Sequence, residues 1–356
     1  MSFSSPGGLL APSLAFVTLA CAIGLGFLLA RSARRAERGG VRGGTVDLFR
    51  TFTGNLAGHV TGDVLRAAAR DAQADSFWAA IEAIASTLRP RERMELAQSL
   101  QRSRHVMAEC RVLRDDDRDE RRELAARRLA LVPSMRARRV LRRTLVRGPE
   151  HVRLAAARAL AAQRDLASLG WLLVHADTLS TRSIGAISGV LRAFGPRGRA
   201  LLVTALERGL VDTRFECAVL DALGLSRCRS ARTGVESRLR SEQLDVRVAA
   251  ARALGRIGMG ESIPALMLAL GDGAWPVRAQ AAHALGRLRA APAVDALAER
   301  VCDPSWWVRR HAAYALAVIG SEGRDALCEL VVRSPDGYAR EMAREALDRA
   351  VVRRSA

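Results

Sequence analysis

The hydrophobic and polar positions in the C-terminal half of the chain follow the period of an amphipathic α-helix. In residues 276–289, PVRAQAAHALGRLR, the apolar positions form one helical stripe: Val277, Ala281, Ala284, Leu285 and Leu288. The chain has few stretches in which Val, Ile, Thr or aromatic residues alternate with polar ones, as they would in strands. The pattern therefore predicts an all-α fold.

The same helical pattern returns at an interval of 31 residues. The positions that keep this interval are Arg247, Arg278, Arg309 and Arg340; Leu254, Leu285, Leu316 and Leu347; Ala250, Ala281, Ala312 and Ala343; and Ala253, Ala284, Ala315 and Ala346. Earlier copies are centred on Leu223, Leu191 and Leu160, and looser ones on Leu129 and Leu100. Such an interval is typical of stacked units that each bury an apolar face against the next.

Each unit is predicted to hold two helices joined by a turn. The second helices are expected in residues 245–258, 276–289, 307–320 and 338–350, and the first helices in 262–270, 293–301 and 324–332. Gly258, Gly286 and Gly320 lie at or near the expected ends of second helices, as helix stops do. The small alanines allow close packing, so a large side chain at Ala281 or Ala312 should cost about 1–3 kcal/mol.

An uncharged apolar stretch, Leu9 to Ala30, precedes the repeats. As a helix it would be about 33 Å long, enough to cross the hydrocarbon core of a bilayer. Positive charge follows the stretch, at Arg31, Arg34, Arg35, Arg38 and Arg42, which places the C-terminal side in the cytoplasm. We therefore expect a single-pass inner-membrane protein with its N-terminus outside. A cleaved signal peptide is the alternative, although residues 1–8 carry no charged side chain.

These patterns divide the chain into six parts. They are an N-terminal tail (1–8), a transmembrane helix (9–30), a basic glycine-containing linker (31–45), divergent helical repeats (46–150), clear repeats of about 31 residues (151–351) and a C-terminal tail (352–356).

The net charge of +19 invites a nucleic-acid or acidic-membrane interpretation. All 56 basic residues are arginine, however, and they are spread along the chain, which indicates genome composition bias. A functional basic surface remains the alternative to an ordinary solvated one. The six cysteines form no CxxC pair and the histidines are scattered. No catalytic motif is present either, so we expect no enzyme activity, no cofactor and no metal site.

The segments resemble HEAT repeats, in particular the short HEAT-like repeats of phycobilisome lyases. The residues that carry the resemblance are Asp272, Val277, Arg278, Ala281, Ala282, Ala284, Leu285 and Gly286, followed by Asp303, Val308, Arg309, Ala312, Ala313, Ala315 and Leu316, with Ala317 in place of the glycine. The resemblance implies a right-handed α-solenoid with an armadillo-type superhelix. It also implies a ladder between adjacent repeats formed by Arg247, Asp272, Arg278, Asp303 and Arg309.

Binding surfaces of such arrays are expected along the second helices. The candidate partner-binding residues there are Arg252, Arg256, His283, Arg287 and Tyr314. Trp275, Trp306 and Trp307 are further candidates, expected in the turns between helices, because tryptophan is enriched at binding hot spots. The alternatives are an ordinary solvated helix face and tryptophans that only cover the edge of the stack.

These observations favour a membrane-tethered cytoplasmic scaffold that binds a protein partner. Nucleic-acid binding in a basic groove, as in HEAT-like alkylpurine DNA glycosylases, is the alternative, and the predicted anchor and interspersed acidic residues oppose it. A bilin-lyase-like enzyme is suggested only by the repeat type, and fold analogy is a poor guide to chemistry. No small-molecule substrate is predicted.

Overall fold

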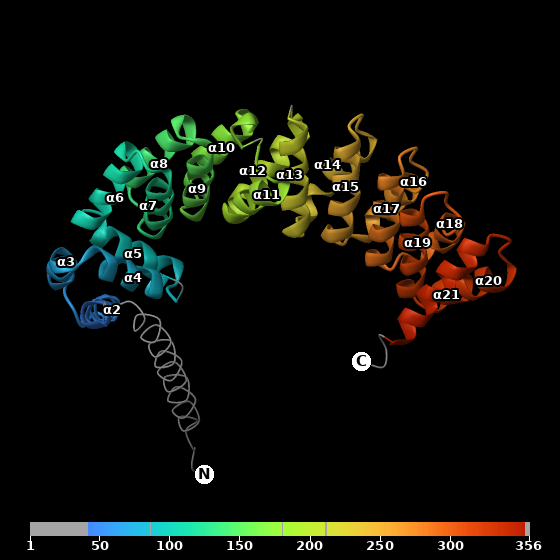
Figure 1. The fold of residues 1–356 in the computed structure, drawn as a ribbon, viewed down its shortest axis with the longest axis horizontal. Coiled ribbons are helices and arrows are strands. Elements are labelled where there is room, and N and C mark those ends of the chain that lie inside the picture. Colours follow the sequence, from blue (N-terminus) through green and yellow to red (C-terminus); the bar gives the residue numbers. More distant parts are fainter. Residues whose placement is uncertain (1–41, 86, 180, 211, 353–356) are drawn as a thin grey trace, which may run out of the picture. The chain divides into compact units, whose positions relative to one another are not determined.

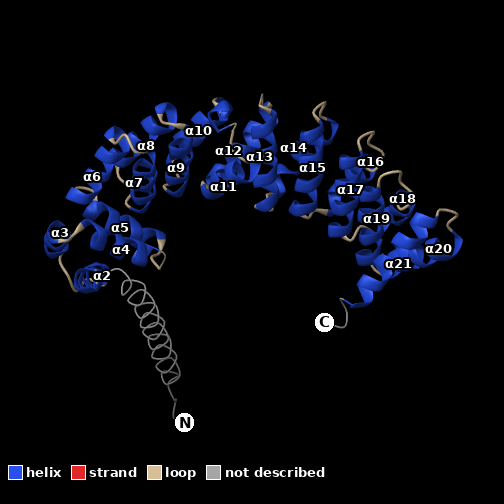
Figure 2. Ribbon diagram, in the orientation of Figure 1, coloured by secondary structure: helices blue, strands red, loops and turns tan. Residues whose placement is uncertain are grey.

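The protein is helical wherever its structure is described. The computed structural model describes residues 42–85, 87–179, 181–210 and 212–352. Within those ranges all regular structure is α-helix or short 3₁₀-helix, and no strand is present (Figure 2). The predicted all-α fold is therefore confirmed for the described residues.

The chain forms two compact units, one ending at Ala159 and the other beginning at Leu160. The helices of the first unit are α2 (Arg42–Leu56), α3 (Gly62–Asp71), α4 (Ala74–Ala85), α5 (Pro90–Leu100), α6 (Arg104–Asp115), α7 (Asp119–Leu131), α8 (Met135–Arg147) and most of α9 (Glu150–Ala162).

An aromatic cluster fills the core of the first unit. The rings of Phe52 and Phe77 meet edge to face at 6.2 Å, and those of Phe77 and Trp78 at 5.1 Å. The imidazole of His105 stacks on Phe77 with the ring centroids 4.5 Å apart. All three aromatic side chains are fully buried.

The second unit is a row of helix pairs. Its helices are α10 (Leu166–Val174), α11 (Ile184–Ala193), α12 (Gly195–Arg208), α13 (Thr213–Leu225), α14 (Arg232–Ser237), α15 (Leu244–Ile257), α16 (Ile263–Ala269), α17 (Trp275–Leu288), α18 (Val294–Arg300), α19 (Trp306–Ile319), α20 (Ser321–Arg333) and α21 (Gly337–Val352). Short 3₁₀ turns are η1 (Ala176–Leu179), η2 (Arg229–Ala231), η3 (Arg238–Arg240), η4 (Gly260–Ser262) and η5 (Ala291–Ala293).

Successive second helices of the repeats pack directly on one another. Helices α13, α15, α17, α19 and α21 form the inner row, while α14, α16, α18 and α20 form the outer one (Figure 1). The predicted second helices are shifted by about one residue, so that Trp275 and Trp306 begin α17 and α19 instead of lying in the preceding turns. Pro276 occupies the first turn of α17, where its missing N–H costs nothing.

Glycines inside the second helices let neighbouring helices approach closely. A Cβ atom built on Gly224, Gly255 or Gly286 would lie 2.8–2.9 Å from the Cα of Ala253, Ala284 or Ala315 on the next second helix. Only a residue without a side chain fits there. Gly286 lies near the end of α17, as predicted, but its role there is a helix–helix contact and not a helix stop. Gly258 does end α15, with a left-handed φ of 80°.

Partly buried ion pairs also join adjacent repeats. Arg247 holds Asp272 with two hydrogen bonds, Nε to Oδ2 at 2.9 Å and Nη2 to Oδ1 at 3.2 Å. Arg278 holds Asp303 in the same way, at 2.8 and 2.9 Å. Both aspartates also accept a backbone N–H two residues ahead, from Ala274 and Ser305. The structure thus contains two of the expected rungs.

The expected third rung is different. Arg309 donates from Nη1 to the carbonyl oxygens of Asp303 and Pro304, as its counterparts do in their own turns. Ser334 stands where the pattern would place an aspartate, so no carboxylate meets Arg309 in the described part of the chain. The Nε of Arg309 is buried without a hydrogen-bond partner, and its guanidinium lies 5.4 Å from the ring centroid of Tyr338.

No helix in the described residues is both long and apolar enough to cross a bilayer. The predicted transmembrane helix at 9–30 lies outside those residues and stays a prediction, as do the linker up to residue 41 and the superhelix handedness.

Candidate functional site

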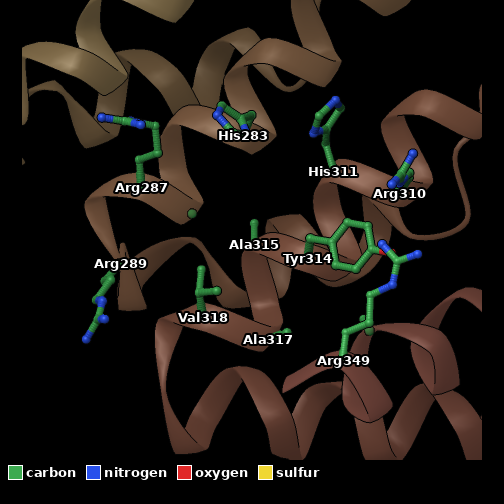
Figure 3. Close-up of a pocket in the computed structure, with 12 residues that line it drawn as sticks. His283, Arg287, Arg289, Arg310, His311, Tyr314, Ala315, Ala317, Val318 and Arg349 are labelled. Carbon is green, nitrogen blue, oxygen red and sulfur yellow. The ribbon is translucent and has the colours of Figure 1, made fainter. Parts of the chain in front are cut away.

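A cavity of about 600 Å³ opens on the inner row of the second unit, between α17, α19 and α21 (Figure 3). Small or apolar side chains form its floor: Ala315, Ala317, Val318 and Ala346. His283, Arg287, Arg289, Arg310, His311, Tyr314 and Arg349 surround it. Its volume lies within the ~300–1,000 Å³ typical of ligand pockets.

The cavity borders the step of the row at which the series of glycine contacts ends. Gly224, Gly255 and Gly286 each touch an alanine on the following helix. Position 317 comes next in this series and is alanine, and its expected neighbour is Ala346. Both alanines line the cavity. The step of the row at which alanine replaces the glycine therefore lies beside the cavity.

A smaller hollow of about 270 Å³ continues the cavity across α15 and α17. It is lined by Arg252, Arg256 and Gln280, and it shares His283, Arg287 and His311 with the cavity. We call the two hollows together the groove. The groove thus crosses four adjacent second helices, α15, α17, α19 and α21.

The groove contains more arginines than nearby carboxylates can pair with. Arg256 pairs with Asp221 of α13, and Arg349 pairs with Glu345 at 3.0 Å. Among the described residues, no carboxylate pairs with Arg252, Arg287, Arg289 or Arg310 within 4.0 Å. Arg287 uses one N–H, because its Nε donates to the carbonyl of Gly255 at 3.0 Å. The guanidinium groups between Asp221 and Glu345 are therefore available to an anionic group.

Tyr314 lies at the centre of a cluster of cations (Figure 3). The guanidinium carbons of Arg310 and Arg349 lie 5.3 and 5.2 Å from its ring centroid. Its hydroxyl donates to Oε1 of Glu345 at 2.9 Å. Arg310 also lies 5.2 Å from the ring of Trp306. These contacts hold the guanidinium of Arg310 over two aromatic faces, so its side chain loses less conformational entropy when it binds a ligand.

His283 and His311 meet edge to face inside the groove, with their ring centroids 5.3 Å apart. Desolvation in the groove lowers the pKa of His283, and the charges of Arg287, Arg252 and Arg256 lower it further. Desolvation, His283 and Arg310 lower the pKa of His311 in the same sense. Both imidazoles are therefore neutral at pH 7, and each can donate and accept one hydrogen bond.

The predicted tryptophans lie at the N-terminal ends of α17 and α19. Trp275, Trp306 and Trp307 are 46%, 43% and 48% exposed. The indole rings of Trp306 and Trp307 meet edge to face at 4.8 Å. Only Trp306 is joined to the groove, through Arg310. The other two tryptophans do not line either hollow.

All five predicted inner-row residues, Arg252, Arg256, His283, Arg287 and Tyr314, line the groove. The candidate binding residues did not include Gln280, Arg289, Arg310 or His311, which also line the groove. Arg310 and His311 stand four and three residues before Tyr314, and such residues share a helix face. A search one turn before the predicted row would have found them. Arg289 caps the end of α17 with a left-handed φ of 49°, so its side-chain direction does not follow from the helical spacing of the residues before it.

Among the described residues, no three His, Cys, Asp or Glu side chains lie together as metal ligands would. Cys217 is buried, and burial raises its thiol pKa to about 11. A thiol with so high a pKa is a poor nucleophile.

The fold and the groove define a class: an all-α protein of stacked helix pairs with a cationic groove on the inner helices. Residues 263–348 match the family model described as HEAT repeats, and residues 246–272 match the one described as PBS lyase HEAT-like repeat. The chain therefore contains HEAT repeats in residues 246–348, as the resemblance implied.

No curated protein matches the chain. Solved structures that resemble it include an engineered protein (19% identity; 86% of this chain and 99% of that one covered; TM-score 0.35). The E. coli protein YibA covers 80% of this chain and 96% of its own at 14% identity, with a TM-score of 0.37. Human deoxyhypusine hydroxylase in complex with glycerol covers 82% and 96% at 21% identity, with a TM-score of 0.31.

Proposed function

We propose that this protein is a binding scaffold that holds a partner protein in the groove of its HEAT repeats and performs no chemistry itself. The observation that carries the proposal is the groove across α15, α17, α19 and α21, with four arginines that no carboxylate pairs in the described part of the chain. HEAT-type arrays bind along such continuous surfaces, because stacked repeats place equivalent side chains in rows. The inner helices supply these rows here.

The test compares two pairs of charge reversals in the full-length chain. Arg252→Glu with Arg287→Glu changes the groove, whereas Arg208→Glu with Arg229→Glu changes exposed arginines on α12 and η2. Each pair lowers the net charge by the same amount. Proteins that co-purify with the wild-type chain in mild detergent should be lost from the groove variant and retained by the control variant. Equal recovery of these proteins with both variants would show that the groove is not the surface that binds them.

We also propose that residues 9–30 tether the scaffold to the inner membrane, with the repeats in the cytoplasm. The support is the uncharged stretch of 22 residues followed by arginines. The full-length chain should sediment with membranes and resist extraction by carbonate, while a chain that begins at residue 42 should stay in the supernatant. Processing of the N-terminus, detected by mass spectrometry of the mature chain, would instead indicate a cleaved signal peptide.

A further inference from the structure

The groove has an apolar part and a cationic part side by side. The apolar part is the floor of the cavity, made by Ala315, Ala317, Val318 and Ala346. Removing apolar surface from water stabilises a complex by about 25 cal/mol per Å² buried. A ligand that fills this floor therefore needs at least one apolar side chain, and a small inorganic anion cannot satisfy it.

The cations of the groove are arginines at sites suited to carboxylates. Arg252, Arg287 and Arg310 come from three successive second helices. A guanidinium binds a carboxylate with two parallel hydrogen bonds, which fixes direction as well as strength. Cations spaced one helix apart match carboxylates distributed along a chain better than they match a single acidic group.

The dimensions of the groove fit a short extended segment. Packed helices lie about 8–10 Å apart, so the three steps from α15 to α21 cover about 24–30 Å. An extended chain advances about 3.3 Å per residue, which corresponds to about eight residues. An extended backbone also needs hydrogen-bond partners, because its N–H and C=O groups are not paired within it. Gln280, His283 and His311 line the groove and offer such partners.

We propose that the groove binds an extended acidic peptide segment of the partner protein. Carboxylates of the segment pair with Arg252, Arg287 and Arg310, and one of its apolar side chains fills the cavity floored by Ala317 and Val318. This inference rests on the proposed scaffold function and names the chemistry of its partner.

A nucleic acid fits the same surface less well. The unpaired arginines lie between the ion pairs of Asp221 with Arg256 and of Glu345 with Arg349, so a longer phosphate backbone that continued along the row would extend beyond them. The aromatic ring inside the groove, Tyr314, already has guanidinium groups near its ring and donates to Glu345. It is therefore not available to stack on a base.

Binding of defined probes tests the proposal in the full-length chain in mild detergent. The probe is a fluorescein-labelled ten-residue peptide in which aspartates and glutamates flank a central Leu-Phe pair. One matched peptide carries Asn and Gln in place of the acids, and another carries Gly-Gly in place of Leu-Phe. Fluorescence anisotropy should show that each matched peptide binds at least about tenfold more weakly.

Two valines provide a matched pair of variants for the apolar contact. Val318, 40% exposed, lines the cavity, whereas Val332, 80% exposed, lies on the outer helix α20. Val318→Glu should weaken binding of the acidic probe by about tenfold or more, because it adds a like charge and removes apolar surface. Val332→Glu should leave binding unchanged. Circular dichroism should show equal helix content in both variants.

Three outcomes would overturn the proposal. Equal affinity for the acidic and the amide probe would show that the groove arginines do not bind the carboxylates of the peptide. Equal effects of Val318→Glu and Val332→Glu on binding would show that the cavity does not hold an apolar side chain of the peptide. An oligonucleotide of equal charge that displaces the acidic probe, with a steep salt dependence, would show that the groove binds phosphates. If groove-dependent proteins co-purify but the acidic probe does not bind, the scaffold function stands and only this inference fails. If no protein co-purifies through the groove and the acidic probe does not bind, the scaffold function and this inference both fail.

Discussion

At the scale of single residues, the pairs between Arg278 and Asp303 and between Arg247 and Asp272 connect the repeats. The side chain of Asp303 is 1% exposed. Its burial alone would raise the pKa, but hydrogen bonds from Arg278 and from the N–H of Ser305, and the charges of Arg278 and Arg300, outweigh this. The pKa of Asp303 therefore lies below its ordinary value. Its partner Arg278 has a raised pKa, mainly because of the same hydrogen bonds.

Replacing this carboxylate should be costly. Asp303→Asn leaves the partly buried guanidinium of Arg278 without an opposite charge, and we expect a loss of about 2 kcal/mol in the free energy of unfolding. Glu329→Gln is the control, because the pair of Glu329 with Arg333 is exposed and should contribute little. Urea unfolding followed by far-UV circular dichroism measures both. A loss no larger than that of the control would contradict the structural role of this rung.

The pH dependence of the same variant has a definite sign. The pKa of Asp303 is lower in the folded chain than in the unfolded chain, so the unfolded chain binds more protons at acid pH. The stability that the carboxylate contributes is present above a pH of about 4 and is lost as the pH falls through the folded pKa. Wild type and Asp303→Asn should therefore become more similar in urea midpoint as the pH is lowered below about 4.

At the scale of helices, glycines at helix–helix contacts let neighbouring second helices pack closely. The 31-residue interval predicted the positions of the second helices to within a residue or two, because leucine and alanine repeat on one stripe. The interval did not show what Gly286 does. A glycine near a helix end and a glycine at a helix–helix contact look alike in a sequence. The cavity was equally hidden, since its lining brings together side chains from three helices, α17, α19 and α21.

Substitution of glycine by alanine should have opposite effects at two helical positions. At Gly286 the new Cβ would lie 2.8 Å from the Cα of Ala315, so Gly286→Ala should destabilise the second unit by about 1–3 kcal/mol. At Gly189, inside α11, a Cβ would meet nothing within 4 Å, so Gly189→Ala should stabilise the helix by about 0.5–1 kcal/mol. Thermal unfolding of the two variants measures the difference. Equal shifts in the same direction would exclude the packing argument.

At the scale of the whole molecule, the net charge of +19 has opposite effects on folding and binding. Repulsion among the arginines opposes the compact state, whereas the same charge attracts an acidic partner. Composition predicted this excess but not its location. The four groove arginines without carboxylate partners became visible only when the acids nearby, Asp221 and Glu345, proved to be paired with Arg256 and Arg349.

Added salt should therefore separate the two effects. Between about 0.05 and 0.5 M NaCl the Debye length falls to about 4 Å, so the urea midpoint should rise while binding of the acidic probe weakens. The Arg208→Glu and Arg229→Glu variant has a net charge of +15, since each change removes two positive units from +19. Its urea midpoint should respond less to salt. A midpoint that falls with salt in both chains would contradict the expected repulsion.

The absence of a carboxylate opposite Arg309 has a consequence for the last repeat. Ser334 replaces the aspartate, and the Nε of Arg309 is left without a hydrogen bond. Helices α20 and α21 are thus attached to the row without the charged clamp that secures α16 and α18, so thermal fraying of the row should begin with them. Since the cavity borders on α21, a bound peptide that contacts both α19 and α21 would suppress this fraying. Occupancy could then be followed as slower amide exchange in the final helix.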